Sequence, residues 1–411
     1  MEPSPLRLEI DGIPEPVCAL AEALEASGYA TWIVGGGLRD LLCEKPPGDF
    51  DLATAAPPEA VLSRFPRAVP IGLRFGTVMV PTPAGPVDIT TLRGNDIEED
   101  LGHRDFTVNA LAWHPGRGEL LDPFDGRSDL AKGRLRAVRC AADRLAEDPL
   151  RALRAVRLVA THGLEIDDEL AQALGDAVPA LSRVARERVR HELVTLLLAP
   201  GVATGLRLLR DGGLEARLAP AAAPDAAAVV EALPARLELR LAGWLRGARP
   251  TAILRKLRFA RRTTDSVADL LRWHPVEWNV DTQRDVAVRR HLKQIGPERA
   301  DDLVALRHAE LRVGESAGTP RAVAGLAQLE ALVAAFERVR QAGDLALRRR
   351  DLAIDGKEVM RLLGCGPGPH VGRTLAFLTH CVVEDPSRNT PETLRRLVET
   401  LAAEPKGGDK S

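Results

Sequence analysis

Two hydrophobic patterns divide the chain near residue 140. Before that point, short apolar runs such as residues 31–34, 77–80 and 87–90 alternate with Gly and Pro, which is typical of strands joined by turns. After it, Leu, Ala and Arg recur with a period of about 3.6 residues, the spacing of amphipathic helices. The pattern predicts an α+β fold, with a small mixed sheet and its helices at the N-terminus and an all-helical remainder.

Composition narrows the class of protein. The 411 residues are 45% hydrophobic, enough for about two to four domains, and only 3% aromatic, which favours helical cores over an all-β sandwich. The five Cys lack C-x-x-C spacing, so neither a zinc ribbon nor a disulfide framework is indicated. There is no basic-then-apolar N-terminal signal and no apolar stretch of about 18 residues. We therefore expect a cytoplasmic protein without a membrane partner.

A run of glycines and a pair of carboxylates follow the first apolar run. Residues 35–37 are all Gly, and a helix over 38–43 would direct its first amides toward an anion. Asp49 and Asp51 lie two residues apart, so an extended backbone turns both carboxylates to one face, where they can hold divalent ions. Two such ions assist in-line displacement at phosphorus. The combination predicts metal-dependent chemistry on a nucleoside triphosphate.

Other glycine-rich nucleotide sites fit this sequence poorly. The glycine run lacks the G-x-G-x-x-G spacing of dinucleotide-binding folds, and no G-x-x-x-x-G-K-[ST] occurs. An Asp-x-Asp pair alone is most often a solvated turn, so the prediction depends on the glycines beside it.

Basic residues are concentrated in one segment of a chain whose net charge is −2. Residues 235–264 contain nine Lys or Arg against one acidic residue, Glu238. Such a segment either follows an RNA backbone or forms a solvated helix face. The candidate RNA contacts are Arg246, Arg249, Arg255, Lys256 and Arg258.

Three further motifs follow the carboxylates, at residues 103–110, 122–130 and 147–157. In the last, arginines recur every third residue, so a helix would carry them as a stripe with the leucines turned away. Asp148 before Pro149 also reads as an ordinary helix start, which would explain these two residues by structure alone.

The order of these motifs over residues 28–200 resembles class II tRNA nucleotidyltransferases of the polymerase-β superfamily, the group of CCA-adding enzymes and bacterial poly(A) polymerases. A weaker likeness covers residues 351–399. The resemblance implies a catalytic head at 1–138, a base-reading helical neck at 139–200, and tRNA-binding helical body and tail domains at 201–320 and 321–411.

The resemblance also implies roles for residues of the head. Gly36 and Arg39 would contact the triphosphate, while Asp49 and Asp51 would bind Mg²⁺. Asp88 lies where the superfamily often has a third carboxylate, and is either the base for the primer hydroxyl or a polar edge residue.

The segment 103–110 resembles a motif that contacts ribose and triphosphate, through Arg104, Asp105 and Asn109. The 2′-hydroxyl contact would favour ribonucleotides. His103 replaces an arginine of the usual pattern, which leaves the role of position 103 open.

In the predicted neck, Asp148 and Arg151 would read the base without a template. Cytosine and adenine both present an amino donor beside a ring-nitrogen acceptor, which one carboxylate and one guanidinium satisfy, whereas uracil and guanine present the opposite pattern. Arg154 and Arg157 would bind the triphosphate or brace the neck.

Only nine residues, 94–102, separate the segment 90–93 from the motif at 103, where CCA-adding relatives have a longer flexible loop. The short loop resembles that of enzymes that add only two cytidines, so we expect CC addition to tRNA from CTP, with a separate A-adding enzyme acting on the same tRNA. Full CCA addition from CTP and ATP is the alternative. A poly(A) polymerase, which the segment 72–78 resembles less, and a non-catalytic RNA-binding relative remain further alternatives.

Overall fold

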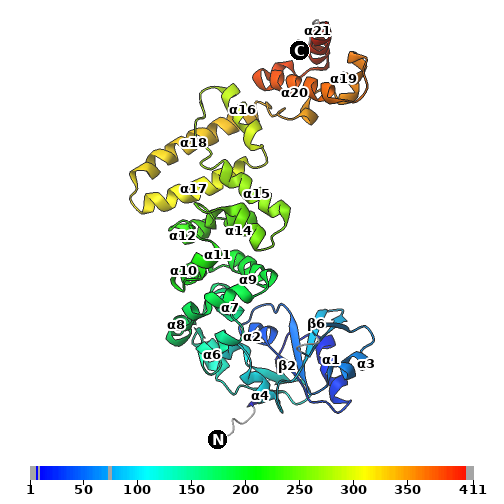
Figure 1. Cartoon of the computed structure of the whole chain (residues 1–411), viewed down its shortest axis with the longest axis vertical. Coiled ribbons are helices and arrows are strands. Elements are labelled where there is room, and N and C mark those ends of the chain that lie inside the picture. The colour runs from blue at the N-terminus through cyan, green and yellow to red at the C-terminus, as the bar shows by residue number, and fades with distance from the viewer. Residues whose placement is uncertain (1–5, 8–9, 73–75, 404–411) are drawn as a thin grey trace. The chain divides into compact units, whose positions relative to one another are not determined.

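The computed structural model describes residues 6–7, 10–72 and 76–403 (Figure 1). The chain divides into two units, residues 1–222 with 256–259 and residues 223–255 with 260–411. Residues 73–75, within the segment compared with poly(A) polymerases, lie outside the described residues. Among the described helices, none is long and apolar enough to cross a membrane.

A mixed sheet forms the centre of the first unit. Its strands, eight in the described residues, follow the order β1-β8-β7-β2-β3-β6-β5-β4. Neighbours pair antiparallel except β3 and β6, which run parallel although β4 and β5 lie between them in sequence. The strands are β1 (Leu6–Arg7), β2 (Thr31–Val34), β3 (Phe50–Thr54), β4 (Val69–Gly72), β5 (Thr77–Thr82), β6 (Gly85–Thr91), β7 (Ala112–His114) and β8 (Glu119–Leu121).

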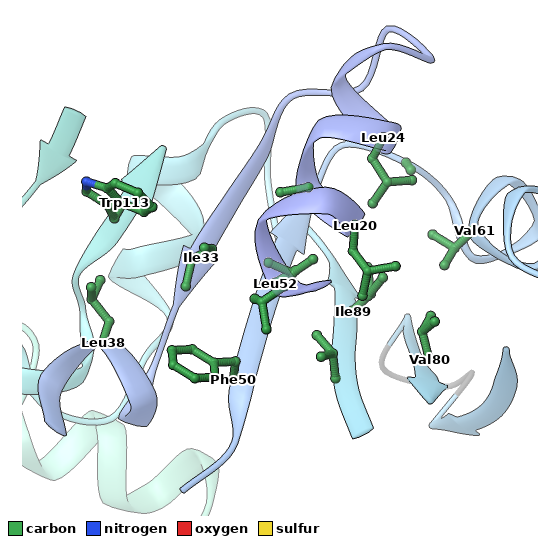
Figure 2. Packing of buried hydrophobic residues seen from close by; sticks show 14 of the residues in the cluster. Leu20, Leu24, Ile33, Leu38, Phe50, Leu52, Val61, Val80, Ile89 and Trp113 are labelled. Carbon is green, nitrogen blue, oxygen red and sulfur yellow. The ribbon is translucent and has the colours of Figure 1, made fainter. Parts of the chain in front are cut away.

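Helices α1 (Glu15–Glu25) and α3 (Pro58–Arg64) contribute side chains to the hydrophobic core of this sheet (Figure 2). The buried residues of α1 lie at helical spacing, and Leu20 and Leu24 belong to the same core cluster as Ile33 of β2. On β3, Phe50 and Leu52 are buried in this core. The residue between them, Asp51, therefore points to the opposite face of the sheet.

The other helices of the first unit follow the sheet strands or lie between them. They are α2 (Gly36–Leu42), α4 (Ile97–Gly102), η2 (Thr107–Asn109), α5 (Gly126–Ala131), α6 (Ala141–Glu147), α7 (Leu150–His162), α8 (Asp168–Ala177), η3 (Pro179–Arg183), α9 (Arg186–Leu198), α10 (Val202–Asp211) and α11 (Leu214–Leu218). Past residue 140 the expected all-helical pattern is interrupted once in the described residues, where β10 (Glu165–Ile166) pairs in parallel with β9 (Arg134–Leu135).

The second unit consists of helices in its described residues, and α14 ends at the boundary with the first unit. They are α12 (Ala226–Glu231), α13 (Leu237–Trp244), α14 (Pro250–Lys256), α15 (Arg261–Arg272), α16 (Asp285–Ile295), α17 (Ala300–Ser316), α18 (Pro320–Gln341), η4 (Arg349–Asp351), α19 (Gly356–Leu363), α20 (Pro369–Glu384), η5 (Pro386–Arg388) and α21 (Pro391–Ala403). The predicted fold class, a mixed N-terminal head followed by a helical remainder, is confirmed. The predicted division into four domains stays a prediction.

Candidate active site

The turn between β2 and α2 brings the backbone close to the carboxylate strand. Gly35 has φ 84° and ψ −151°, a conformation open essentially only to glycine. A Cβ on Gly35 would lie 2.6 Å from Asp51 Oδ2, and one on Gly37 would lie 2.7 Å from the Asp49 carbonyl oxygen. The glycines therefore permit close approach to β3. Helix α2 begins at Gly36, two residues before the expected start.

Three carboxylates converge beside this turn. Asp51 on β3 and Asp88 on β6 are register partners in the parallel pair, and Asp49 immediately precedes β3. Burial raises the pKa of Asp51 to about 6, with Arg104 opposing the rise and the charges of Asp88 and Asp49 adding to it. Burial, followed by the charge of Asp49, also raises the pKa of Asp88. Such mutual repulsion would be relieved by a bound cation.

The donor set fits a divalent cation that is shared with a substrate. In the described residues, no group of three or more His, Cys, Asp or Glu side chains could hold a metal alone. Mg²⁺ is commonly held by one or two carboxylates together with substrate phosphates and water. Asp49 and Asp51 supply such a pair, which leaves coordination positions for a triphosphate.

A chain of side-chain hydrogen bonds links α2 to α7 beside the carboxylates. Arg39 Nη1 donates to Asn109 Oδ1 at 2.6 Å, and Asn109 Nδ2 donates to Asp105 Oδ1 at 2.9 Å. Arg154 Nη1 donates to the other oxygen of Asp105 at 2.8 Å. Burial alone would raise the pKa of Asp105, but Arg154 and the hydrogen bonds from Arg154, Asn109 and the Phe106 amide hold it at about 2. Asp105 thus stays ionised and orients Arg154.

Arg104 places cationic donors beside the carboxylates. Its Nη2 lies 3.3 Å from Asp100 Oδ2, and its Nη1 lies 3.5 Å from the Cβ position of Gly35. Its Nε is buried and has no hydrogen-bond partner among the described residues. A buried donor without a partner is costly, so an anionic ligand at this point would satisfy it.

Helix α7 carries the arginine stripe that the sequence predicted. Leu150, Leu153 and Val156 are buried, as expected. The helix start differs from the prediction, because Pro149 and not Asp148 is the N-cap of α7. Asp148 is the C-cap of α6, and its Oδ1 accepts the Leu150 amide at 3.1 Å.

The two predicted base-reading residues are each held by other groups of the protein. Arg151 donates to the carbonyl oxygens of Arg144 and His103 and to Glu147 Oε2, at 3.0, 2.9 and 2.9 Å. Because the partner at position 103 is a backbone carbonyl, this contact does not depend on the side chain there. Asp148 Oδ2 accepts a hydrogen bond at 2.8 Å from a residue that sequence reasoning missed, Arg188 of α9.

The lower part of the stripe is braced by α9. Arg157 Nε lies 2.5 Å from Glu192 Oε2, and Arg154 Nε lies 3.6 Å from Glu192 Oε1. Glu192 is buried, so the ion pair with Arg157 supports the neck-bracing alternative for that arginine.

The glycine turn, the carboxylates and the arginine stripe border one cavity of about 700 Å³. It contains every head and neck residue singled out from the sequence: Gly36, Arg39, Asp49, Asp51, Asp88, Arg104, Asp105, Asn109, Asp148, Arg151, Arg154 and Arg157. Residues that line it without having been predicted include Asp40, Arg93, Asp100 and Arg188.

The basic segment at 235–264 is only partly available to RNA. Arg246 is buried between Asp225 and Glu310, with both ion pairs at 2.7 Å, so its prediction as an RNA contact is wrong. The two carboxylates already neutralise the charge of this guanidinium, so it would not attract a phosphate. Arg249, Arg255, Lys256 and Arg258 are exposed and remain candidates.

Comparisons with known proteins agree on the family. A model described as the poly A polymerase head domain matches residues 31–136, and one described as a probable RNA and SrmB-binding site of polymerase A matches residues 163–225. The CC-adding tRNA nucleotidyltransferase of Shouchella clausii is 43% identical over 190 residues, 46% of this chain and 50% of that protein. The CCA-adding enzyme of Geobacillus kaustophilus is 30% identical, covering 92% of this chain and 95% of that protein.

Solved structures are similar over nearly the whole chain. The Bacillus stearothermophilus CCA-adding enzyme in complex with CTP aligns with a TM-score of 0.73 at 28% identity, covering 95% of this chain and 98% of that one. The Thermotoga maritima CCA-adding enzyme complexed with tRNA shares the fold with a TM-score of 0.68 at 20% identity. These matches define a nucleotidyltransferase. More narrowly, the chain belongs to the class II tRNA nucleotidyltransferase family of enzymes.

Proposed function

We propose that this enzyme adds two cytidines to the 3′ end of tRNA, using CTP and releasing pyrophosphate. The observation that carries the proposal is the convergence of Asp49, Asp51 and Asp88 with Asp148 and Arg151 in one cavity. Carboxylates alone would suit many phosphoryl transfers. The Asp148 carboxylate and the Arg151 guanidinium in the same cavity can select a base by hydrogen bonds, without a nucleic-acid template.

In this reaction the 3′ hydroxyl oxygen of the tRNA bonds to the α-phosphorus of CTP while the bond to the bridging oxygen breaks, and pyrophosphate leaves. Mg²⁺ held by Asp49 and Asp51 would supply charge stabilisation for the attacking and leaving oxygens. Arg39, Arg104 and Arg154 bind the triphosphate. We assign Asp88, beside Asp51 in the parallel pair, to accept the hydroxyl proton.

Base selection follows from hydrogen-bond patterns. Asp148 accepts from the amino group of cytosine, and Arg151 donates to the acceptors on the same edge. Uracil would set a carbonyl oxygen against the carboxylate and a ring N–H against the guanidinium. Such mismatches cost roughly 1–3 kcal/mol for each lost bidentate contact.

The short segment before His103 supports termination after CC. Residues 97–102 form α4, whose first turn is capped by Asp96 Oδ1 accepting the Glu99 amide at 2.8 Å. Asp100, buried in this helix, also accepts the Arg93 amide at 3.1 Å. A short segment held by these two contacts has little freedom to reshape the base pocket for a second nucleotide.

Full CCA addition from CTP and ATP is the second candidate. Similarity to the CCA-adding enzyme of G. kaustophilus extends over nearly the whole chain, whereas the similarity to the CC-adding relative covers about half of it. In that case the capped segment would suffice for both nucleotides. Under the CC proposal, a separate A-adding enzyme completes the tRNA.

The products distinguish these candidates. Purified enzyme, Mg²⁺ and a tRNA transcript ending before CCA are incubated with CTP, with ATP or with both, and the 3′ ends are sequenced. We expect ends at CC even when ATP is present. Complete CCA ends would favour the second candidate, long A-tails would identify a poly(A) polymerase, and RNA binding without extension would identify a non-catalytic relative.

A further inference from the structure

Arg188 is the basic residue of α9 that faces the base-reading end of the cavity. Its Nη2 donates to Asp148 Oδ2 at 2.8 Å, across 40 residues of sequence, and Arg188 lines the same cavity as Asp148 and Arg151. About half of the Arg188 side chain is exposed, so this contact lies at the mouth of the cavity.

Charged residues of α9 are opposite in sign to the residues of the 147–157 segment that they contact. Arg188 and Glu192 are four residues apart and share one helix face. Glu192 pairs with Arg154 and Arg157, while Arg188 pairs with Asp148 at the start of the stripe. Since α7 packs against α9, Arg188 and Glu192 on one face of α9 reach Asp148 and the lower arginines of the stripe, whereas Arg151 is held by other groups.

Asp148 consequently has a donor on each carboxylate oxygen. The Leu150 amide occupies Oδ1 and Arg188 occupies Oδ2, which together restrict rotation of the carboxylate. Each carboxylate oxygen has two lone pairs, so either oxygen still accepts the amino group of a base. With Arg188 absent, only the Leu150 contact would hold the group, and the carboxylate could turn away from an opposing carbonyl.

We infer that Arg188 is a specificity-determining positioning residue, which holds the Asp148 carboxylate in the orientation that accepts cytosine and rejects uracil. The inference rests on the proposed function. Arg188 acts through Asp148, so its loss weakens the productive contact with CTP and at the same time relieves the clash with UTP.

Nucleotide selectivity tests this inference. We would measure kcat/KM for CTP and for UTP with a tRNA ending before CCA and Mg²⁺, for the wild type, Arg188→Gln and Arg188→Lys. Arg183→Gln is the matched control, because Arg183 is exposed just before α9 and outside the cavity lining. We expect the CTP-to-UTP ratio to fall at least about tenfold in Arg188→Gln, partly recover in Arg188→Lys and stay unchanged in Arg183→Gln.

A double-variant comparison identifies the route of the effect. Arg188→Gln should change the selectivity of Asp148→Asn little, because its target is already altered. Equal losses for CTP and UTP with a lowered melting temperature would show a purely structural role and overturn the inference, as would an unchanged ratio. Failure of the wild type to incorporate CTP would instead refute the proposed function itself.

Discussion

Gly35 is the residue on which the geometry of the active-site turn depends. Its positive φ and its approach to Asp51 exclude any side chain. We expect Gly35→Ala to lower the free energy of unfolding by about 1–3 kcal/mol and to reduce nucleotide addition by displacing the Asp51 carboxylate. Denaturant unfolding and the rate of CTP incorporation measure the two effects.

Gly175→Ala provides the matched control. Gly175 lies within α8, where an added Cβ meets nothing within 4 Å. This substitution should stabilise the protein by roughly 0.5–1 kcal/mol, since Ala favours helix. Equal destabilisation by the two substitutions would contradict the account of Gly35.

Glu310 gives the second unit a defined response to acid. Burial alone would raise its pKa, but the hydrogen bond from His274, with Arg307 and Arg246, lowers it from 4.5 to about 2. Folding therefore favours the ionised form of Glu310. Its contribution to the free energy of unfolding is fully present above pH 4.5 and is lost as the pH falls toward 2.

We therefore expect the stability difference between wild type and Glu310→Gln to shrink over that pH range. Urea unfolding at successive pH values measures it, with the exposed Glu330→Gln on α18 as control. A difference that stays constant, or grows as the pH falls, would contradict the assignment.

Individual charges show where sequence reasoning reaches its limit. Arg246 and Arg255 both belong to the basic segment, but only Arg255 is exposed. The difference depends on Asp225 and Glu310, which are distant in sequence, so charge density alone could not show it. Arg188 escaped notice for the same reason, because its partner lies 40 residues away.

At the scale of elements, local pattern predicted the strand and the helix that border the cavity. The strand at Thr31–Val34 was expected over the same residues, because an apolar run there enters the glycines, and all four residues are buried. The arginine stripe on α7 follows directly from helical spacing. Helix α4 was not foreseen, because a segment of nine residues between motifs reads as a loop unless its Asp96 cap is recognised.

The cap of α4 is open to a direct test. Asp96→Ala removes the acceptor of the Glu99 amide and should destabilise α4 by about 1 kcal/mol. Hydrogen exchange of the Glu99 amide should become faster. If this segment limits the product, loosening α4 should also allow some A addition after CC when ATP is present. Faster exchange with no change in product would show that α4 does not cause termination at CC.

At the scale of the whole molecule, hydrophobic periodicity predicted an N-terminal head and a helical remainder, and both are present. The division of the backbone into two units could not be predicted from this periodicity, because similar Leu- and Ala-rich helices lie on both sides of the boundary. The exposed arginines and lysine near that boundary are the proposed RNA contacts.

Salt dependence tests these contacts. Arg255→Gln with Lys256→Gln should reduce the slope of log affinity for tRNA against log salt concentration by about one to two, because up to two phosphate contacts are lost. Arg64→Gln with Arg67→Gln, both exposed and outside the cavity lining, is the control. An unchanged slope in the first variant would remove these residues from the RNA-binding surface.

The carboxylates of the cavity are the groups to which we assign nucleotidyl transfer to tRNA. The rate of CTP incorporation by Asp51→Asn measures this most directly, with tRNA affinity and melting temperature recorded on the same sample. We predict a loss of at least about a hundredfold with tRNA affinity and fold retained, because the amide is a weaker ligand for Mg²⁺. Incorporation within a few-fold of wild type would contradict the account.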